Sequence, residues 1–172
     1  MRIYYDTEFI EDGKTIDLIS IGMVTDDGRE YYAVSSEMPL RRIFTHKWLM
    51  KNVVPSLPVS DAHSLHLFSL DHANSAVKPR QVIANEVRDF IRATRRPELW
   101  AWYGAYDHVV LCQLWGAMIA LPTGVPMWTS DLRQEAERLG NPELPAMPGV
   151  SEHNALSDAR EVRYRAEWLA AQ

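Results

Sequence analysis

Apolar and turn-forming residues alternate along the first part of the chain in a pattern typical of short strands. Residues 2–9, 16–24 and 30–34 are rich in isoleucine, valine and tyrosine, and turns containing Gly13 and Gly28 separate them. Connections this short cannot carry a parallel crossover, so we predict an antiparallel meander. The first of these strands is expected to be central and buried.

The rest of the chain mixes helical and strand-like spacing. Apolar positions predict helices over 79–94, 107–115, 131–139 and 154–169, whereas residues 99–103 read as a buried strand. Pro79 suits the first position of its helix, and Thr129 or Ser130 can cap the helix over 131–139. Residues 52–78, 122–126 and 141–149 are predicted to be mostly loop. The expected inward positions of the first and last helices are Val82, Ile83, Val87, Phe90, Ile91, Leu156, Val162, Ala166 and Leu169.

These elements describe an α/β fold, in which helices flank a mixed sheet made of a three-strand antiparallel meander and parallel strands. At 172 residues, the chain is expected to form a single domain over 1–172. Self-association as a homodimer is plausible on general grounds, because symmetric dimers are the commonest soluble oligomers. No part of the sequence locates an interface.

Composition narrows the class of protein. Cys112 is the only cysteine, which excludes a disulfide framework and a CxxC zinc site, and its apolar helical context favours a core position. The chain has no run of about 18 apolar residues and no basic-then-apolar leader, so we expect a cytoplasmic protein without a membrane partner. The net charge of −5 argues against a general nucleic-acid coat but is compatible with an enzyme that gathers acids around a metal.

Two acids on the first strand are the first candidates for chemistry. Asp6 and Glu8 are separated by one residue, so they project from the same face of a strand, about 7 Å apart. Two carboxylates on a core strand repel each other and lose hydration, and a divalent cation between them would relieve both costs. The alternative is an ordinary strand end whose polar face meets water.

Further acids occur at two helix starts. Asp107 follows the strand over 99–103 at the opening of a helix, where an N-cap or first-turn role is the alternative interpretation. His153 and Asp158 are five residues apart, which on a regular helix would point them about 140° away from each other. They can share a target only if His153 belongs to the preceding loop and Asn154 caps the helix. A surface helix start is the alternative for this pair.

The segment 38–60 is basic and contains no acidic residue. Its cations are interleaved with aromatic rings, a combination that suits a single-stranded nucleic acid, because phosphates attract cations and bases stack on rings. Lys47 and Lys51 would share one side of a helical turn. The alternative is a solvated basic face with Trp48 in the core. The candidate residues are Arg41, Arg42, His46, Lys47, Trp48 and Lys51.

In combination these signals form an ordered set that resembles the DEDDh family of 3′-5′ exonucleases, within the RNase H-like superfamily that includes proofreading subunits, oligoribonuclease and RNase T. Within this family the chain is most similar to the small single-domain actinobacterial type, polyadenylate-specific 3′-exoribonuclease AS. The motifs span nearly the whole chain and are Tyr5-Asp6-Thr7-Glu8-Phe9, Tyr103-Gly104-Ala105-Tyr106-Asp107 and His153-Asn154-Ala155-Leu156-Ser157-Asp158-Ala159-Arg160.

The resemblance implies a metal-dependent phosphodiester hydrolase with an RNase H-like fold and two Mg²⁺ or Mn²⁺ ions. Asp6 would bridge both ions, Glu8 and Asp158 would hold the one that carries the nucleophilic water, and Asp107 would support the other. His153 would take the proton of that water. The expected substrate is single-stranded RNA or an RNA 3′ overhang, and the product is a nucleoside 5′-monophosphate such as AMP.

Substrate contacts follow less directly. Phe9 either stacks on the terminal base or packs in the core, and Thr7 and the basic segment are further candidates for binding RNA. Many members of the family carry Asn where this chain has Tyr103, so any contact made by that amide is in doubt. Three other functions stay open: a DNA exonuclease with the same site, a non-catalytic nucleic-acid-binding module, and a structural domain that binds a partner protein.

Overall fold

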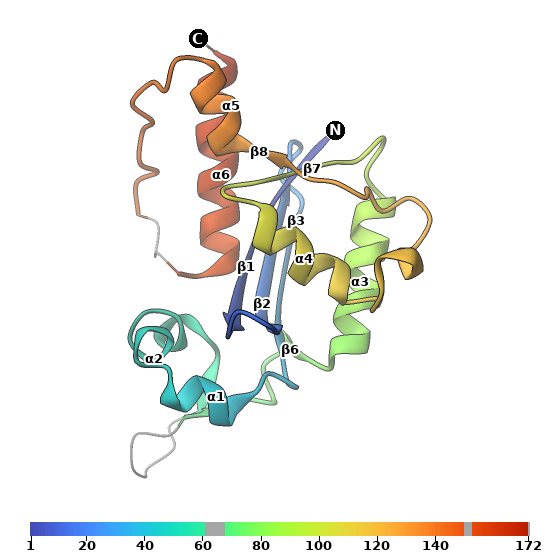
Figure 1. Ribbon diagram of the computed structural model, residues 1–172, viewed down its shortest axis with the longest axis vertical. Coiled ribbons are helices and arrows are strands. Elements are labelled where there is room, and N and C mark those ends of the chain that lie inside the picture. Colours follow the sequence, from blue (N-terminus) through green and yellow to red (C-terminus); the bar gives the residue numbers. More distant parts are fainter. Residues whose placement is uncertain (61–67, 150–152, 172) are drawn as a thin grey trace.

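A mixed six-stranded sheet forms the centre of the protein (Figure 1), here described from a computed structural model for residues 1–60, 68–149 and 153–171. The strand order is β6-β3-β2-β1-β7-β8, so β1 is an interior strand, as expected. Strands β1, β2 and β3 form the predicted antiparallel meander, and β7 pairs with β1 in parallel. The strands are β1 (Arg2–Glu11), β2 (Ile16–Thr25), β3 (Glu30–Ser35), β6 (Val77–Lys78), β7 (Glu98–Ala101) and β8 (Ser130–Asp131).

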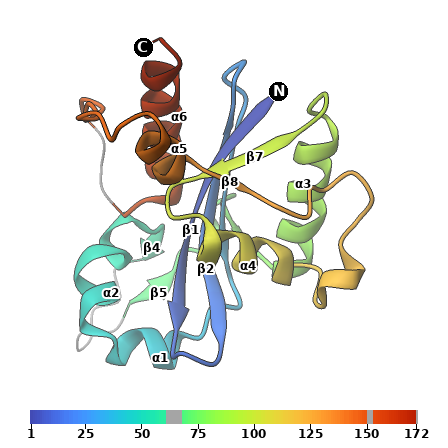
Figure 2. The same cartoon turned by 45° about the horizontal axis from the view of Figure 1, so that its top comes forward.

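Helices cover both faces of this sheet. Figure 2 shows α5 (Leu132–Arg138) and α6 (Ala155–Ala170) on one side and α3 (Arg80–Arg92) and α4 (Ala105–Gln113) on the other. Alternation along β1 divides its side chains between these layers, because Tyr4 packs with α5 and α6 whereas Tyr5 packs with α3 and α4. The α/β prediction of a mixed sheet flanked by helices is therefore confirmed.

The basic segment folds into a small lobe beside the sheet. It contains α1 (Leu40–Thr45), α2 (Lys47–Asn52) and the 3-10 turn η1 (Val54–Ser56), anchored through Ile43 and Leu49 on an apolar cluster with β1, β2 and β3. Strands β4 (Val59–Ser60) and β5 (Ser69–Leu70) form a separate ladder, and η2 (Met118–Ala120) follows α4. Residues 61–67 of the predicted loop lie outside the described residues. None of the helices within the described ranges combines the length and apolar character of a membrane span.

Some predicted boundaries and inward positions were wrong. The strand expected over 99–103 ends at Ala101, and Tyr103 has a left-handed backbone (φ 55°) and is 63% exposed. The cap of the helix expected over 131–139 is the Asp131 side chain, not Thr129 or Ser130. Ser130 and Asp131 form the short strand β8, so the helix begins at Leu132. Val82 is exposed, and on α6 the buried first-turn position is Ala155, with Leu156 only partly covered.

Candidate active site

Strand β1 presents its two acids on the face covered by α6, and its intervening threonine on the face covered by α4. Thr7 is buried, and both its backbone N–H (2.9 Å) and its hydroxyl (2.6 Å) donate to one carboxylate oxygen of Asp107. Asp107 lies in the first turn of α4 and is only 6% exposed. Of the alternative roles for Asp107, the N-cap is wrong, since Gly104 is the N-cap, whereas the first-turn position is found; the carboxylate also accepts both hydrogen bonds from Thr7 of β1.

The loop before α6 adopts the arrangement that the spacing of His153 and Asp158 required. Asn154 caps α6 by accepting from the Ser157 N–H (3.1 Å), and His153 lies just outside the helix with φ 61°. The Ser56 hydroxyl donates to the His153 carbonyl (2.7 Å), which ties this left-handed residue to the segment after α2. Histidine is among the residues that tolerate this region of backbone space. The imidazole is thus held at the start of α6.

The histidine and the carboxylates converge. One side-chain ligand atom each of Glu8, His153 and Asp158 lie within 4.8 Å of one another. Asp6 and Asp158 line the same hollow of about 390 Å³, together with His153. Asp107 joins this group through Thr7, its neighbour on β1. Residues from β1, α4 and the start of α6 therefore lie close to one another.

Burial and mutual repulsion make the acids difficult to ionise. Burial, and then the charges of Asp107, Glu8 and Asp158, raise the pKa of Asp6 well above its usual range. Burial, with Asp158 and Asp107 nearby, raises the pKa of Glu8 to about 8. Burial raises the pKa of Asp107 to about 6, although the two bonds from Thr7 act in the opposite direction. A cation among these groups would favour the ionised forms.

A glycine lets α6 approach the sheet closely enough to build the site. Gly22 of β2 pairs with Asp6 of β1, and a Cβ on Gly22 would lie 2.3 Å from the backbone of Ala155 and Leu156. The first turn of α6 therefore rests directly on β2. An Arg160–Glu30 pair with contacts of 2.6 and 2.7 Å fastens the helix to β3. Gly22 and Ser56 are positioning residues that the sequence analysis did not identify.

Aromatic rings border the acids on the side of α2. The Trp48 ring meets the His153 ring edge-on with centroids 4.8 Å apart, and Trp48 is 49% exposed, so it is not a core residue. Phe9 stacks in parallel on Tyr106, with ring centroids 5.8 Å apart, and is partly buried against the main core. A hollow of about 170 Å³ lies between Phe9, Trp48 and His46.

The other candidate residues differ in their availability. Arg41, Lys47 and Lys51 are exposed on α1 and α2, and His46 caps α2 through its ring nitrogen. Arg42 is ion-paired with Asp12 (3.3 Å) and Asp17, which links α1 to the β1–β2 hairpin. The Thr7 side chain faces Asp107, and Tyr103 is at the surface.

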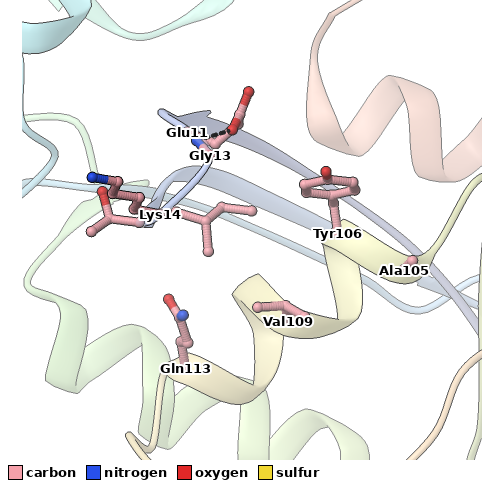
Figure 3. Close-up of a pocket in the computed structure, with 9 residues that line it drawn as sticks. Glu11, Gly13, Lys14, Ala105, Tyr106, Val109 and Gln113 are labelled. Carbon is pink, nitrogen blue, oxygen red and sulfur yellow. Dashed lines mark hydrogen bonds between the residues drawn. The ribbon is translucent and has the colours of Figure 1, made fainter.

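A second hollow, of about 350 Å³, lies outside the acid cluster. Figure 3 shows Tyr106, Val109 and Gln113 projecting from α4 toward the turn that carries Gly13 and Lys14. None of the four clustered acids lines this hollow. The hollow lined by Asp6, His153 and Asp158 is the larger of the two, and it is also the one in which titratable groups cluster, so it is the better candidate for the site of chemistry.

A central strand carrying two acids, with further acids supplied from helices on either face, is the arrangement of an RNase H-like nuclease. A solved structure of Pop2p from S. pombe, in its Mg²⁺- and Mn²⁺-bound form, superposes with a TM-score of 0.62 over 99% of this chain and 83% of that one, at 11% identity. This likeness shows the fold.

Sequence comparison gives the family. The family model described as a 3′-5′ exoribonuclease Rv2179c-like domain matches residues 1–169. The 3′-5′ exoribonuclease Rv2179c of Mycobacterium tuberculosis H37Rv is 49% identical over 163 residues, which cover 94% of this chain and 88% of that protein. The corresponding protein of strain CDC 1551, MT2234.1, gives the same values. The chain belongs to the Rv2179c-like family of 3′-5′ exoribonuclease domains, which confirms the predicted family and enzyme class.

Proposed function

We propose that this chain removes nucleotides from the 3′ end of single-stranded RNA or of an RNA 3′ overhang and releases nucleoside 5′-monophosphates. The observation that carries the proposal is the gathering of Asp6, Glu8, Asp107 and Asp158 around β1, with His153 beside Glu8 and Asp158. A domain that only binds RNA has no use for four acids that repel both one another and the phosphates of the ligand. We take residues 1–172 as one exonuclease domain.

The donor set fits divalent cations. Carboxylate oxygens are the ligands that Mg²⁺ and Mn²⁺ prefer, and a cluster of acids whose pKa values burial raises is stabilised by a cation rather than by protons. We propose that Asp6, Glu8, Asp107 and Asp158 would hold two such ions. When bound, the ions supply the positive charge that offsets the charge developing on the phosphate and on the leaving 3′-oxygen.

His153 is proposed as the general base. Its ring lies beside Glu8 and Asp158, and Ser56 and Asn154 fix its backbone, so the imidazole is placed to take a proton from the attacking water. Trp48 packs against the same ring and limits its rotation. Thr7 holds Asp107 with two hydrogen bonds, which orients that carboxylate in advance of binding.

The hollow between Phe9 and Trp48 is proposed to receive the terminal base, because both rings border it and it adjoins the acids. A monophosphate product such as AMP would occupy the same place. Lys47 and Lys51 on α2, and Arg41 on α1, would then attract the backbone. Arg42 is left out of this set because of its two ion pairs.

The proposal is tested by incubating the protein with matched RNA and DNA oligomers labelled at the 5′ end, with Mg²⁺ or with EDTA. We expect a ladder of products that shortens from the 3′ end, for RNA, only with Mg²⁺. Release of internal fragments, or binding without cleavage, would overturn the proposal. Cleavage of DNA at a rate equal to or above that of RNA would contradict the assignment of RNA as the preferred substrate.

Replacing His153 by alanine should lower kcat by about 10²- to 10⁴-fold, because the proton acceptor is removed while the acids stay in place. The metal-dependent gain in Tm should persist. His72, exposed in a turn, offers a matched control, and His72→Ala should leave the rate within twofold. A His153→Ala enzyme within fivefold of wild type would assign proton removal to another group.

The stability of the metal-free protein should fall as pH rises from about 5 to about 8. The folded-state pKa values of Asp107 (about 6) and Glu8 (about 8) lie above their unfolded values, so stability is fully present below about pH 4 and is lost as each group ionises in the folded state. Each 1 kcal/mol corresponds to about 2–4 °C in Tm.

Thermal unfolding in EDTA and in Mg²⁺ measures this effect. Mg²⁺ should raise Tm more at pH 8 than at pH 5, since the cation competes with protons for the same carboxylates. Glu8→Gln should flatten the curve in EDTA above pH 6. A Tm in EDTA that is constant or rises over this range would show that these carboxylates are not buried together.

A further inference from the structure

The hollow that contains the acids extends along α6, away from the hollow bordered by Phe9 and Trp48. Its described lining passes from Asp6, His153 and Asp158 to a second group made up of Trp102, Glu161, Val162 and Arg165. His153 stands where the two hollows meet, because it lines this one while its ring contacts Trp48, which lines the other. An RNA strand that passes from one hollow to the other would cross the acids.

Helical spacing places the three members of the second group that belong to α6 on the same side of that helix as Asp158. Glu161, Val162 and Arg165 follow Asp158 by three, four and seven residues, which are the intervals of one helix face. Seven residues correspond to about 10 Å along the helix axis. Side chains on a helix tilt toward its N-terminus, so the long Arg165 side chain extends back in the direction of Asp158.

The Arg165 guanidinium is held in advance of any ligand. One terminal nitrogen donates to Glu161 at 2.6 Å, and the guanidinium carbon lies 5.2 Å from the centre of the Trp102 ring. About a quarter of the Arg165 side chain (24%) remains exposed. A cation fixed from two sides loses little side-chain freedom when it binds an anion, which makes the interaction stronger than that of a free surface arginine.

Charge indicates which anion this position suits. Among the described residues that line the hollow, Arg165 is the permanent cation, whereas Asp6, Asp158 and Glu161 are acids. RNA that enters the site carries a further phosphate for each nucleotide before the scissile one. A planar guanidinium can bind phosphate with two parallel hydrogen bonds, and the acids alone would repel it.

We propose that Arg165, clamped between Glu161 and Trp102, binds the phosphate on the 5′ side of the penultimate nucleotide. This inference rests on the proposed function, in which the terminal nucleotide occupies the hollow of Phe9 and Trp48 and the scissile phosphate lies at the acids. The strand then leaves across α6, and Arg165 is a specificity-determining residue that reads the presence of a second phosphate. It takes no part in the bond cleavage.

Dinucleotides with and without a 5′-phosphate isolate this contact, because they share the scissile bond and both bases and differ only in the phosphate assigned to Arg165. Wild type should hydrolyse the 5′-phosphorylated dinucleotide with a KM about tenfold lower and a similar kcat, as expected for one charge-assisted hydrogen-bonded contact. Arg165→Met should reduce the preference to less than twofold. Arg165→Lys, which keeps the charge, should retain part of it.

Arg163→Met is the matched control, because Arg163 lies on the same helix in a similar ion pair, with Glu167 at 2.7 Å, and does not line the hollow. It should keep the tenfold preference. A preference that survives Arg165→Met, or that Arg163→Met removes equally, overturns the proposal. If Arg165→Met does not fold, the preference of the wild type is measured at increasing salt concentration instead. A preference that depends on a phosphate contact must weaken as salt rises, and a preference that stays constant contradicts the proposal.

The proposed function and the assignment of Arg165 can be overturned separately. If wild type does not shorten RNA from its 3′ end, the proposed function is wrong and the dinucleotide comparison has no basis. If wild type shortens RNA normally but Arg165→Met and wild type show the same preference for the 5′-phosphate, only the assignment of Arg165 is wrong.

Discussion

Replacing Asp6 with asparagine should abolish RNA hydrolysis and at the same time stabilise the metal-free protein. The activity should fall by roughly 1,000-fold or more, because the amide removes one of the charges proposed to hold the cations. The stability in EDTA should rise by about 1–3 kcal/mol, since asparagine carries no charge, whereas Asp6 can ionise only against burial and against repulsion by Glu8, Asp107 and Asp158. Rates on end-labelled RNA and denaturant unfolding in EDTA measure the two effects.

Asp89→Asn provides the control, because Asp89 is exposed on α3 and pairs only with the neighbouring Arg88 among the described ion pairs. It should change neither the rate nor the stability by more than about 0.5 kcal/mol. An Asp6→Asn protein that keeps a tenth of the wild-type rate would remove Asp6 from the chemistry. A protein destabilised in EDTA by the same change would show that the cluster is not strained by its own charge.

The second large effect is expected at Gly22, although this residue touches no substrate. A methyl group there would lie 2.3 Å from the backbone of Ala155 and Leu156, and backbone at the start of a helix cannot move aside without moving the helix. Gly22→Ala should therefore cost about 3 kcal/mol or more, by overpacking. Because α6 carries Asp158 and follows His153, the folded fraction should also lose most of its activity.

Gly116→Ala separates this effect from the general cost of replacing glycine. Gly116 has φ 87°, and no atom lies within 4 Å of the place that a methyl group would take, so alanine there should cost only about 1 kcal/mol through its backbone conformation. Thermal unfolding and RNA hydrolysis of the two variants give the comparison. Equal losses of stability, or a Gly22→Ala enzyme with wild-type activity, would show that α6 does not depend on its contact with β2.

The sequence could predict those parts of the site that local rules determine. Alternation along a strand places Asp6 and Glu8 on one face, and short turns require the antiparallel meander of β1, β2 and β3. Strand β1 is interior because β7 pairs with its other edge. The unfavourable helical spacing of His153 and Asp158 required a loop histidine and an Asn154 cap, and both are found. These inferences need only the geometry of one element at a time.

Contacts between distant elements could not be predicted in this way. The glycine within β2 signals a close approach of other backbone, yet nothing local indicates that α6 is the partner. Strand β8 has two residues, too few for a periodic pattern, so Asp131 was mistaken for a residue within its helix. The ring contact of Trp48 with His153 depends on how the α1–α2 lobe packs beside the sheet.

The most direct test of the central claim is the binding of Mn²⁺ to wild type and to Asp6→Asn, measured by calorimetry and compared with the Mn²⁺ dependence of RNA hydrolysis. We expect two ions for each wild-type chain, weakened binding in Asp6→Asn, and a rate that rises as the sites fill. Hydrolysis at the full rate in EDTA, or Mn²⁺ binding that Asp6→Asn leaves unchanged, would contradict the central claim.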